Sequence, residues 1–392
     1  MEPDAYAVGT MAQQKTRVVC GMSGGVDSSA TAALLLEQGY EVIGITLKLW
    51  PQDCVNRATD RCCGPQAVTD ARAVCHKLDI PYYLIDEADE FQKHVIRYFA
   101  DEYKAGRTPN PCVMCNQNLK FGRLIDRANQ LGAEYIATGH FARIERACSS
   151  RREEAHTDSG AENQSLLTSA APGRFLLKRG RDLRKDQSYF LFSLRQDQLA
   201  RALFPLGEMT KSDTRDVARH CQLKTAEKEE SMEICFVPDN DYGGFLRQAG
   251  LAQKHRGEIV DAQGQVLGHH DGIEFYTIGQ RRGLGIASSK PLYVIELDAE
   301  NNRVVVGDES ALGRDAFTVE RCNWIPFEAP PGPIEVVAKI RYNHPGATAR
   351  VTPTDDGRAN VKMDAPQRAI TPGQAAVFYQ GDLVLGGGWI VR

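Results

Sequence analysis

Residues 17–29, with the sequence RVVCGMSGGVDSS, decide how the first half of the chain is expected to fold. The apolar run RVVCGM predicts a buried strand, and DSSATAALLLEQ, from Asp27 onward, predicts a helix that ends at Gly39. The adjacent Gly24 and Gly25 allow a tight turn and a close approach of the backbone to a ligand. Because backbone N–H groups and the helix dipole favour an anion at such a helix start, the stretch predicts a phosphate-binding loop. The alternative is an ordinary glycine-rich turn, since the Gly-Lys-Ser/Thr ending of a Walker A loop is absent from the sequence.

Strand and helix patterns continue to alternate after this loop. The patterns predict strands at 41–50, 81–86 and 134–140, and helices at 67–78, 91–104 and 118–131. Such alternation with short connections predicts an α/β fold built on a doubly wound parallel sheet. Ligands of these sheets bind beyond the carboxyl ends of the strands, so the phosphate loop, residues 47–50 and residues 139–140 are expected to converge on one crevice.

The rest of the chain has a different composition. Residues 147–173 are polar, rich in Ser and Ala and without periodicity, which predicts a mobile surface insertion. After Asp239, glycines increase and short alternating runs such as IEVVAKIRY are separated by turns, which predicts a small all-β barrel or sandwich. The expected organisation is a flexible tail (1–16), an α/β domain (17–239), a small central domain (240–308) and a C-terminal barrel-like domain (309–392).

The composition limits the class of protein. The 392 residues suggest about two or three domains, and 42% hydrophobic with 25% charged residues is typical of a globular protein. No apolar run approaches the roughly 18 residues that span a bilayer, and the first residues lack the basic start and apolar core of a signal peptide. We therefore expect a cytoplasmic protein without a membrane partner, in which the eleven cysteines stay reduced.

Charge is unevenly distributed along the chain. The net charge is −4, but residues 174–224 contain twelve Lys and Arg against six Asp and Glu. Electrostatic attraction to nucleic-acid phosphates is local, so this basic segment predicts an RNA-binding surface. The alternative is a solvated charged face.

Several motifs resemble one known family. Ser23–Ser28, SGGVDS, resembles the pyrophosphate loop (PP-loop) of ATP pyrophosphatases, which cleave ATP to AMP and pyrophosphate. Together with RTPNPCVMCN, ATGHFAR, KDQSYFLF, EICFVPDNDY, YTIGQRRGLGI and TPGQAAVFY, it is similar to the bacterial tRNA-specific 2-thiouridylases. The similarity runs from about Arg17 to the C-terminus and is interrupted by residues 147–173.

The resemblance implies an ATP site and its metal. The residues it implies for ATP are Gly21, Met22, Ser23, Gly24, Gly25, Val26, Asp27, Ser28, Leu47 and Gly139. Asp27 is expected to help position Mg²⁺ and pyrophosphate, and its alternative role is that of a helix N-cap. Activation by ATP suits the chemistry, because a uracil carbonyl oxygen leaves readily only after AMP has been attached to it.

The resemblance also implies how tRNA is bound. The residues it implies for tRNA contacts are His140, Lys185, Asp186, Gln187, Arg341, Tyr342 and Gln374, and those implied for the pocket of the extruded base are Asn110, Pro111 and Cys112. A wobble base already lies in a single-stranded loop, so extruding it costs little. The implied partners are tRNAs of the Lys, Glu and Gln type and a sulfur donor, either a cysteine desulfurase or a sulfur relay protein.

Two cysteines are implied for the sulfur chemistry. Cys115 and Cys235 match the functional pair of the family, whereas many relatives carry Asp at the position of Cys112. Two mechanisms stay open: a [4Fe–4S] cluster on Cys112, Cys115 and Cys235, or a persulfide on Cys235 that Cys115 resolves as a disulfide bond. A zinc site is disfavoured because no second C-x-x-C pair accompanies Cys112 and Cys115.

Simpler roles are expected for the other cysteines, and two alternative functions stay open. Burial as small hydrophobes is expected for Cys20, Cys75, Cys221 and Cys322, whereas the roles of Cys54, Cys62 and Cys63 stay open. The alternative functions are another PP-loop tRNA thiolase acting on a different base and an ATP pyrophosphatase synthetase that transfers no sulfur.

Overall fold

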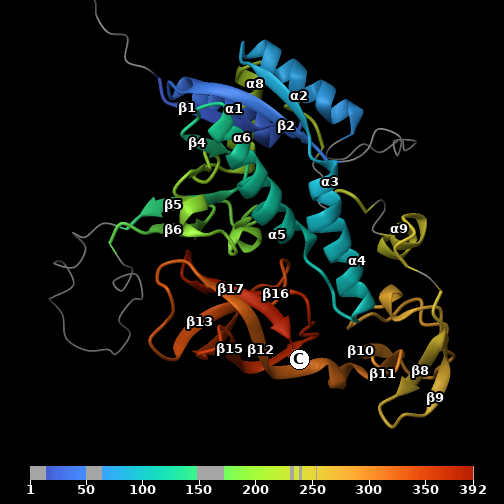
Figure 1. Ribbon diagram of the computed structural model, residues 1–392. Helices are drawn as coiled ribbons and strands as arrows, with labels where there is room; N and C mark the ends of the chain where they lie inside the picture. The colour runs from blue at the N-terminus through green and yellow to red at the C-terminus, as the bar shows by residue number, and fades with distance from the viewer. Residues whose placement is uncertain are drawn as a thin grey trace, which may run out of the picture.

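The computed structural model describes residues 15–49, 64–147, 172–229, 234–237, 241–252 and 254–391, and every structural statement below concerns those residues. Figure 1 shows an α/β unit, a β-barrel below it and a small β unit beside the barrel. The expected tail is outside the described residues up to position 14, and so is most of the expected insertion, from 148 to 171. Cys54, Cys62 and Cys63 also lie outside them.

The α/β unit is built on a parallel sheet. Its strands are β1 (Arg17–Gly21), β2 (Glu41–Lys48), β3 (Tyr82–Asp86), β4 (Tyr135–Ala137) and β7 (Ala202–Leu203). They run in the order β3-β2-β1-β4-β7, and every pairing is parallel. The chain therefore turns from one side of β1 to the other between β3 and β4, and the predicted sheet is confirmed.

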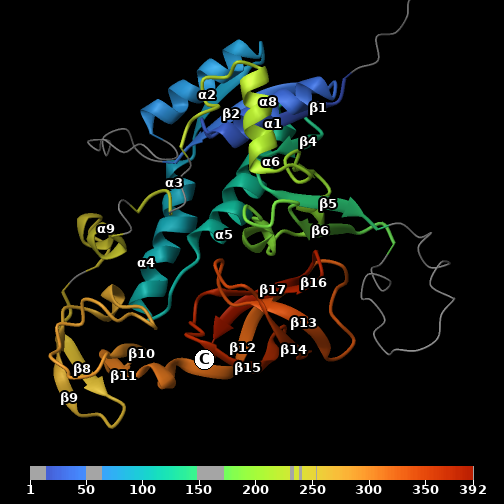
Figure 2. The same ribbon diagram turned by 180° about the vertical axis from the view of Figure 1, so that it is seen from behind.

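Helices cover both faces of this sheet. They include α1 (Val26–Glu37), α2 (Pro65–Lys77), α6 (Leu124–Gln130) and α8 (Lys211–His220). Val18 and Cys20 of β1 pack with residues of α1 and α2, whereas Val19 points to the opposite face and packs with Leu124 of α6. Figure 2 shows α8 lying beside α1. The period-2 alternation of β1 thus divides its side chains between two apolar clusters.

Two long helical runs follow the sheet strands. The first joins α3 (Ala88–Phe91), the π-helical segment η2 (Gln92–Ile96) and α4 (Arg97–Lys104), and the second joins α5 (Pro111–Cys115), η3 (Asn116–Arg123) and α6. The predicted helix at 118–131 therefore begins earlier than expected. Pro111 stands at its first position, and the Asn110 side chain accepts a hydrogen bond from Val113 N (3.4 Å). In the described part of the chain no helix is long and apolar enough to cross a membrane.

The small β unit lies at the end of α4, as Figure 1 shows. It contains α9 (Tyr242–Gln248), β8 (Gly257–Asp261), β9 (Val266–His270), β10 (Tyr293–Asp298) and β11 (Arg303–Gly307). The ring of Tyr103 on α4 stacks on that of Tyr242 on α9, with 4.7 Å between ring centroids. This contact joins the α/β unit to the small β unit.

The C-terminal strands close into a barrel. They are β12 (Gly313–Trp324), β13 (Ile334–Lys339), β14 (Ala347–Pro353), β15 (Ala359–Arg368), β16 (Ala375–Gln380) and β17 (Leu383–Val391), and β12 pairs with both β15 and β17. The barrel sheet also receives the hairpin of β5 (Ala142–Arg146) and β6 (Phe175–Arg179), through the pairing of Leu383 with Lys178. The predicted barrel is confirmed, and its sheet continues into the α/β unit.

The barrel and the α/β unit share an apolar core. Val377, Tyr379 and Trp389 of the barrel belong to the same cluster of buried residues as Val19 of β1. The Trp389 ring lies 5.9 Å from that of Tyr98 on α4, in an edge-on arrangement. The barrel is therefore packed as part of one folded body.

We expect Trp389→Ala to lower the free energy of unfolding by about 3–5 kcal/mol, because it opens a cavity in this shared core. The measurement is denaturant unfolding followed by circular dichroism. The control Tyr83→Ala removes a ring that is 46% exposed and should change stability by less than about 0.5 kcal/mol. A variant whose barrel loosens while the α/β unit keeps its full stability would contradict the shared core.

Candidate active site

The loop between β1 and α1 is shaped by its serines and glycines. Gly25 is the N-cap of α1 and has no side chain to occupy the N–H groups of the first turn. Ser28 Oγ accepts a hydrogen bond from Ser23 N (3.2 Å) and donates one to Gly25 O (3.1 Å). The loop is therefore closed by its own side chains and presents a helix N-terminus of the kind that binds phosphate.

The two glycines of this loop have different roles. Gly24 has φ +70°, and a Cβ on it would lie 2.2 Å from Ala67 O of α2. A Cβ on Gly25 would meet only Ser23 Oγ, at 3.5 Å. Gly24 is thus required for folding the loop against α2, whereas Gly25 leaves space beside the helix start.

The end of β4 lies directly against the start of α1. A Cβ on Gly139 would be 2.8 Å from Asp27 Cβ, so only glycine allows this approach. The structure therefore brings Gly139 to the phosphate loop, at the edge where the strand order changes sides. Met22 and Val26 point inward and are 2% and 3% exposed, so they can offer a ligand only their backbone groups.

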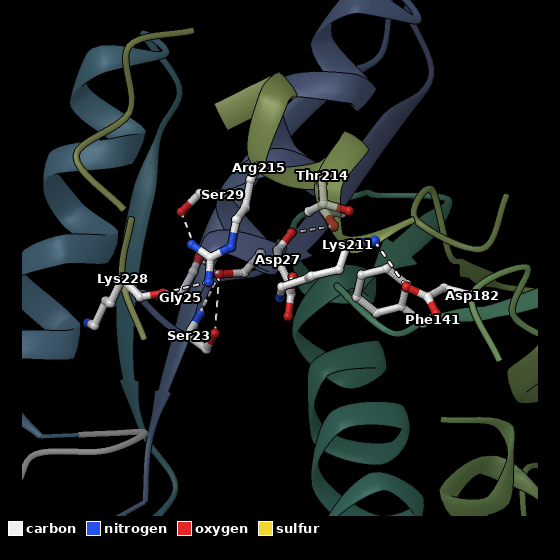
Figure 3. A network of polar contacts seen from close by, with 12 residues as sticks. Ser23, Gly25, Asp27, Ser29, Phe141, Asp182, Lys211, Thr214, Arg215 and Lys228 are labelled. Carbon is white, nitrogen blue, oxygen red and sulfur yellow. Dashed lines mark hydrogen bonds and ion pairs between the residues drawn. The ribbon is translucent and has the colours of Figure 1, made fainter. Parts of the chain in front are cut away.

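Asp27 is held by a lysine from a distant helix. Its carboxylate Oδ1 lies 2.5 Å from Nζ of Lys211, the first residue of α8, as Figure 3 shows. The Lys211 side chain is only 12% exposed, and its Nζ lies 5.6 Å from the centre of the Phe141 ring. Since Gly25 is the N-cap, the alternative reading of Asp27 as the cap is wrong.

More positive charge gathers around the loop. Lys228 Nζ donates to Gly24 O (3.0 Å) and to Asp70 Oδ2 (2.6 Å), and the Arg215 guanidinium donates to Lys228 O (3.1 Å). Burial disfavours the Asp70 carboxylate, but hydrogen bonds from Lys224 and Lys228 outweigh this and lower its pKa. Figure 3 shows Arg215 and Lys228 beside the loop residues. Sequence reasoning missed Lys211, Arg215 and Lys228; the only signal was the basic segment 174–224, which was assigned to RNA and holds Lys211 and Arg215.

The thiols of the expected functional pair lie at one apolar cluster. Cys115 on α5 and Cys235 are both partly buried, and both pack against a cluster that contains Phe236 and Leu119. Leu47, at the end of β2, packs against the same cluster. The structure thus places Leu47, Cys115 and Cys235 around one set of apolar side chains and holds Cys112, Cys115 and Cys235 as thiols.

A metal centre on these cysteines was tested against the geometry. Among the described residues, no group of three or more His, Cys, Asp or Glu side chains is placed to hold a metal ion. Residues 230–233 and 238–240, on either side of Cys235, lie outside those residues. That search concerns a single metal ion, whereas the cysteines of a [4Fe–4S] cluster bind different iron atoms, so a cluster on Cys112, Cys115 and Cys235 stays a prediction.

The other cysteines divide by burial. Cys20 and Cys75 are buried as expected, and burial raises the pKa of the Cys75 thiol to about 12. Cys221 and Cys322 pack against apolar clusters as small hydrophobes but are only partly buried, so the expected burial holds for them in part.

Asn110 and Pro111 form the start of α5, the cysteine helix, which contains Cys112 and Cys115. Asn110 is 6% exposed, and its backbone N donates to Tyr98 Oη (3.4 Å) while its side chain caps α5. Pro111 is buried at the first helical position. Cys112 and Cys115 therefore lie in the first turn of a helix, and a role of these residues in a base pocket stays a prediction.

His140 is enclosed. It is 8% exposed, its Nδ1 lies 2.6 Å from Thr138 Oγ1, and its ring packs near those of Phe121 and Phe204. Burial, and then the nearby Lys120, lower its pKa well below the ordinary value, so the imidazole is neutral. The predicted contact of His140 with tRNA is not tested by this geometry.

The Lys185-Asp186-Gln187 motif is a turn held by side-chain hydrogen bonds. The buried Asp186 carboxylate accepts hydrogen bonds from Gly180 N (3.2 Å) and from Ser188 N (3.0 Å). Gln187 Oε1 accepts from the backbone N next to His140, that of Phe141 (3.0 Å). Asp186 and Gln187 therefore hold the turn, whereas Lys185 is partly exposed, and its contact with RNA stays a prediction.

Two of the three predicted RNA-contacting residues of the barrel, Arg341 and Tyr342, lie beside this motif. The Tyr342 ring lies 4.5 Å from that of Phe190, three residues after Gln187. Arg341 donates to Arg368 O (3.2 Å), and burial, followed by the charge of Arg368, lowers the pKa of Arg341. The structure thus brings the motif and residues 341–342 together, whereas Gln374 points to another segment, Thr108–Pro109.

Comparison with family models divides the chain into matching segments. Residues 16–239 match the model described as "tRNA methyl transferase HUP domain". Residues 244–308 match "tRNA methyl transferase PRC-barrel domain", and residues 314–390 match "Aminomethyltransferase beta-barrel domain". The domain limits expected from the sequence differ from these by a few residues and stay predictions.

Curated relatives cover almost the whole chain. It is 49% identical over 380 residues to "tRNA-specific 2-thiouridylase MnmA" of Heliobacterium modesticaldum. The aligned region covers 96% of this chain and 93% of that protein. The proteins of the same name from Moorella thermoacetica and Geobacter metallireducens are both 48% identical, over 94% and 96% of this chain and 98% and 97% of theirs.

We expect Gly24→Ala to destabilise the protein by more than about 1 kcal/mol, because alanine is strained at this positive φ and its Cβ meets the α2 backbone. Gly25→Ala is the matched control and should fold with near-normal stability. Thermal unfolding followed by circular dichroism makes the comparison. Equal midpoints for the two variants would contradict the different roles of these glycines.

Proposed function

The chain belongs to the family of bacterial tRNA-specific 2-thiouridylases, and we propose that it replaces O2 of the wobble uridine of tRNA with sulfur, using ATP and releasing AMP and pyrophosphate. The observation that carries the proposal is the meeting of a phosphate-type loop with two thiols at one end of the sheet. Ser23–Ser28 follows β1, and Cys115 and Cys235 flank the cluster against which Leu47 packs. A phosphate-binding loop alone would not require thiols beside it, and a pair of thiols alone would not require a phosphate-binding loop.

The loop and its cations suit ATP. In the proposal, N–H groups at the start of α1 bind phosphate oxygens, and Gly25 leaves the space for them. Lys211 and Lys228 supply positive charge where pyrophosphate would leave. Mg²⁺, when bound, would neutralise phosphate charge, and the Asp27 carboxylate offers the kind of oxygen ligand that it prefers.

The proposed reaction has three substitutions, at phosphorus, at carbon and at sulfur. First, O2 of the uracil attacks the α-phosphorus of ATP, and the bond to pyrophosphate breaks. Next, the terminal sulfur of a persulfide on Cys235 attacks C2, and AMP leaves with the former O2. The Cys115 thiolate then attacks Cys235 Sγ, the persulfide S–S bond breaks, sulfur stays on the base and a Cys115–Cys235 disulfide forms. A dithiol reductant and a persulfide donor restore the enzyme.

The persulfide route has more support from the geometry than the cluster route. Cys115 and Cys235, the two thiols that the persulfide route uses, both pack against one apolar cluster. We therefore derive no step through a [4Fe–4S] cluster. The proposal includes a cytoplasmic location, a cysteine desulfurase or relay protein as sulfur donor, and tRNAs of the Lys, Glu and Gln type.

The test supplies ATP with Mg²⁺, a small persulfide donor, a dithiol and unmodified tRNA to iron-free protein, and identifies the nucleoside by mass spectrometry. We expect 2-thiouridine from the wild type and from Cys112→Ala, and a loss of at least about 100-fold in turnover for Cys115→Ala and for Cys235→Ala. Cys221→Ala is the control and should keep full activity. Thiolation of a different base, or activity that survives loss of both Cys115 and Cys235, would contradict the proposal.

If Lys185 binds a phosphate of the tRNA, Lys185→Ala should weaken tRNA binding and reduce the log–log salt slope by about one unit. Arg195→Ala provides a matched control in the same basic segment, because Arg195 is already paired with Asp197 at 2.8 Å. Binding is measured by fluorescence anisotropy at a series of salt concentrations. An unchanged slope for Lys185→Ala would remove this residue from the RNA interface.

A further inference from the structure

The segment between α4 and α5 determines where the cysteine helix begins. The start of this segment is fixed because Arg107 donates to both carboxylate oxygens of Glu102 (2.7 and 2.6 Å). Its end is fixed because Asn110 N donates to Tyr98 Oη (3.4 Å), and Asn110 then caps α5. Cys112 is only two residues further along.

The middle of this segment is held by the barrel. Thr108 N donates to Pro372 O (2.8 Å), and the Gln374 amide Nε2 donates to both Thr108 O (3.3 Å) and Pro109 O (3.1 Å). The hydroxyl of Thr108 is buried and makes no hydrogen bond to the described residues. The position of Thr108 and Pro109 thus depends on bonds to the barrel rather than on the Thr108 side chain.

The barrel loop that makes this contact is itself held by hydrogen bonds to β17. Gly373 N donates to Ile390 O (2.9 Å), and Ile390 N donates to Gln374 O (2.8 Å), so the loop is tied to β17. Gly373 has φ +87°, and a Cβ on it would lie 2.8 Å from Thr108 O. The backbones of the two segments therefore approach as closely as glycine permits.

We propose that Gln374 is a positioning residue for the thiols: its amide fixes Thr108–Pro109 to the barrel and thereby sets the first turn of α5, which carries Cys112 and Cys115. This inference depends on the proposed function in one respect only, namely that these thiols take part in the reaction. It differs from the role expected by resemblance, in which Gln374 contacts tRNA. Because Nε2 donates to two carbonyl oxygens of the protein itself, a tRNA group that accepted from this donor would have to replace its bonds to the segment before the cysteines.

The test measures thiol reactivity in the full-length protein without tRNA. Iodoacetamide is added, and the alkylation rates of Cys112 and Cys115 are followed by peptide mass spectrometry. Gln374→Met keeps the size of the side chain but cannot donate, and we expect both rates to rise about two- to tenfold as the first turn of α5 opens more often. Gln374→Glu should act in the same direction, because its carboxylate would face the carbonyl oxygens of Thr108 and Pro109.

The matched control is Gln367→Met. Gln367 is also a barrel glutamine whose Nε2 donates to a backbone carbonyl, Ala365 O (2.8 Å), but its hydrogen bonds are to the barrel residues Ala365 and His344, so its replacement should leave both rates unchanged. Cys322 on β12 is the internal reference and should react equally in all variants, which separates a local effect from global unfolding. In the thiolation assay, Gln374→Met should lower kcat while the tRNA dissociation constant stays within about twofold.

Two results would overturn the proposal. The first is wild-type alkylation of Cys112 and Cys115 in both Gln374 variants, and the second is a parallel rise at Cys322. Weakened tRNA binding with unchanged alkylation would leave Gln374 as an RNA contact. Since alkylation needs neither ATP nor tRNA, this outcome is distinguishable from a failure of the proposed function.

Discussion

The position of β1 between β2 and β4 is the constraint on which the site depends. Parallel strands place all their carboxyl ends at one edge, and the chain changes sides of the sheet at β1, where ligands of such sheets bind. The glycine loop leaves β1 at this edge, Gly139 leaves β4 beside it, and Leu47 ends β2 next to the cluster of Cys115 and Cys235. The nucleotide and the thiols can share one edge because the strand order gives both access to it.

Charge at this edge is balanced inside the protein. The Asp27–Lys211 pair and the Asp70–Lys228 pair place lysines around the loop, each with a carboxylate partner. Partly buried cations are stable in this arrangement because each has an anion and further hydrogen bonds. A triphosphate would bring its own negative charge to the same lysines. The cost of placing that charge in the crevice would then be met by groups that are already oriented.

The sequence predicted the parts of the site that are local in the chain. The strand–loop–helix at 17–37 is one continuous signal, and the barrel strands follow from period-2 alternation. The start of α5 was also readable, because Asn110 and Pro111 form a cap followed by proline at the first helical position. Lys211 and Arg215 were missed because their approach to the loop comes from the packing of α8 on α1, which no local pattern encodes. Lys228 was missed because it reaches the loop from the segment after α8, through its bonds to Gly24 O and to Asp70 of α2. Likewise, a motif such as Lys185-Asp186-Gln187 does not reveal which side chains brace the turn and which remain available to a ligand.

The barrel is packed against and hydrogen-bonded to the α/β unit rather than simply appended to it. Its strand β17 continues into the hairpin β5–β6, its Trp389 packs against Tyr98, and its loop at 371–374 is bonded to the segment before α5. The predicted RNA contacts at residues 341–342 lie on the same barrel and against the aromatic end of the Lys185 motif. A tRNA that binds these residues is therefore held by the same body that positions the thiols. Because interior packing is dense, a body of this kind transmits small displacements rather than absorbing them. Recognition of the RNA and placement of the sulfur chemistry thus depend on one continuous set of contacts.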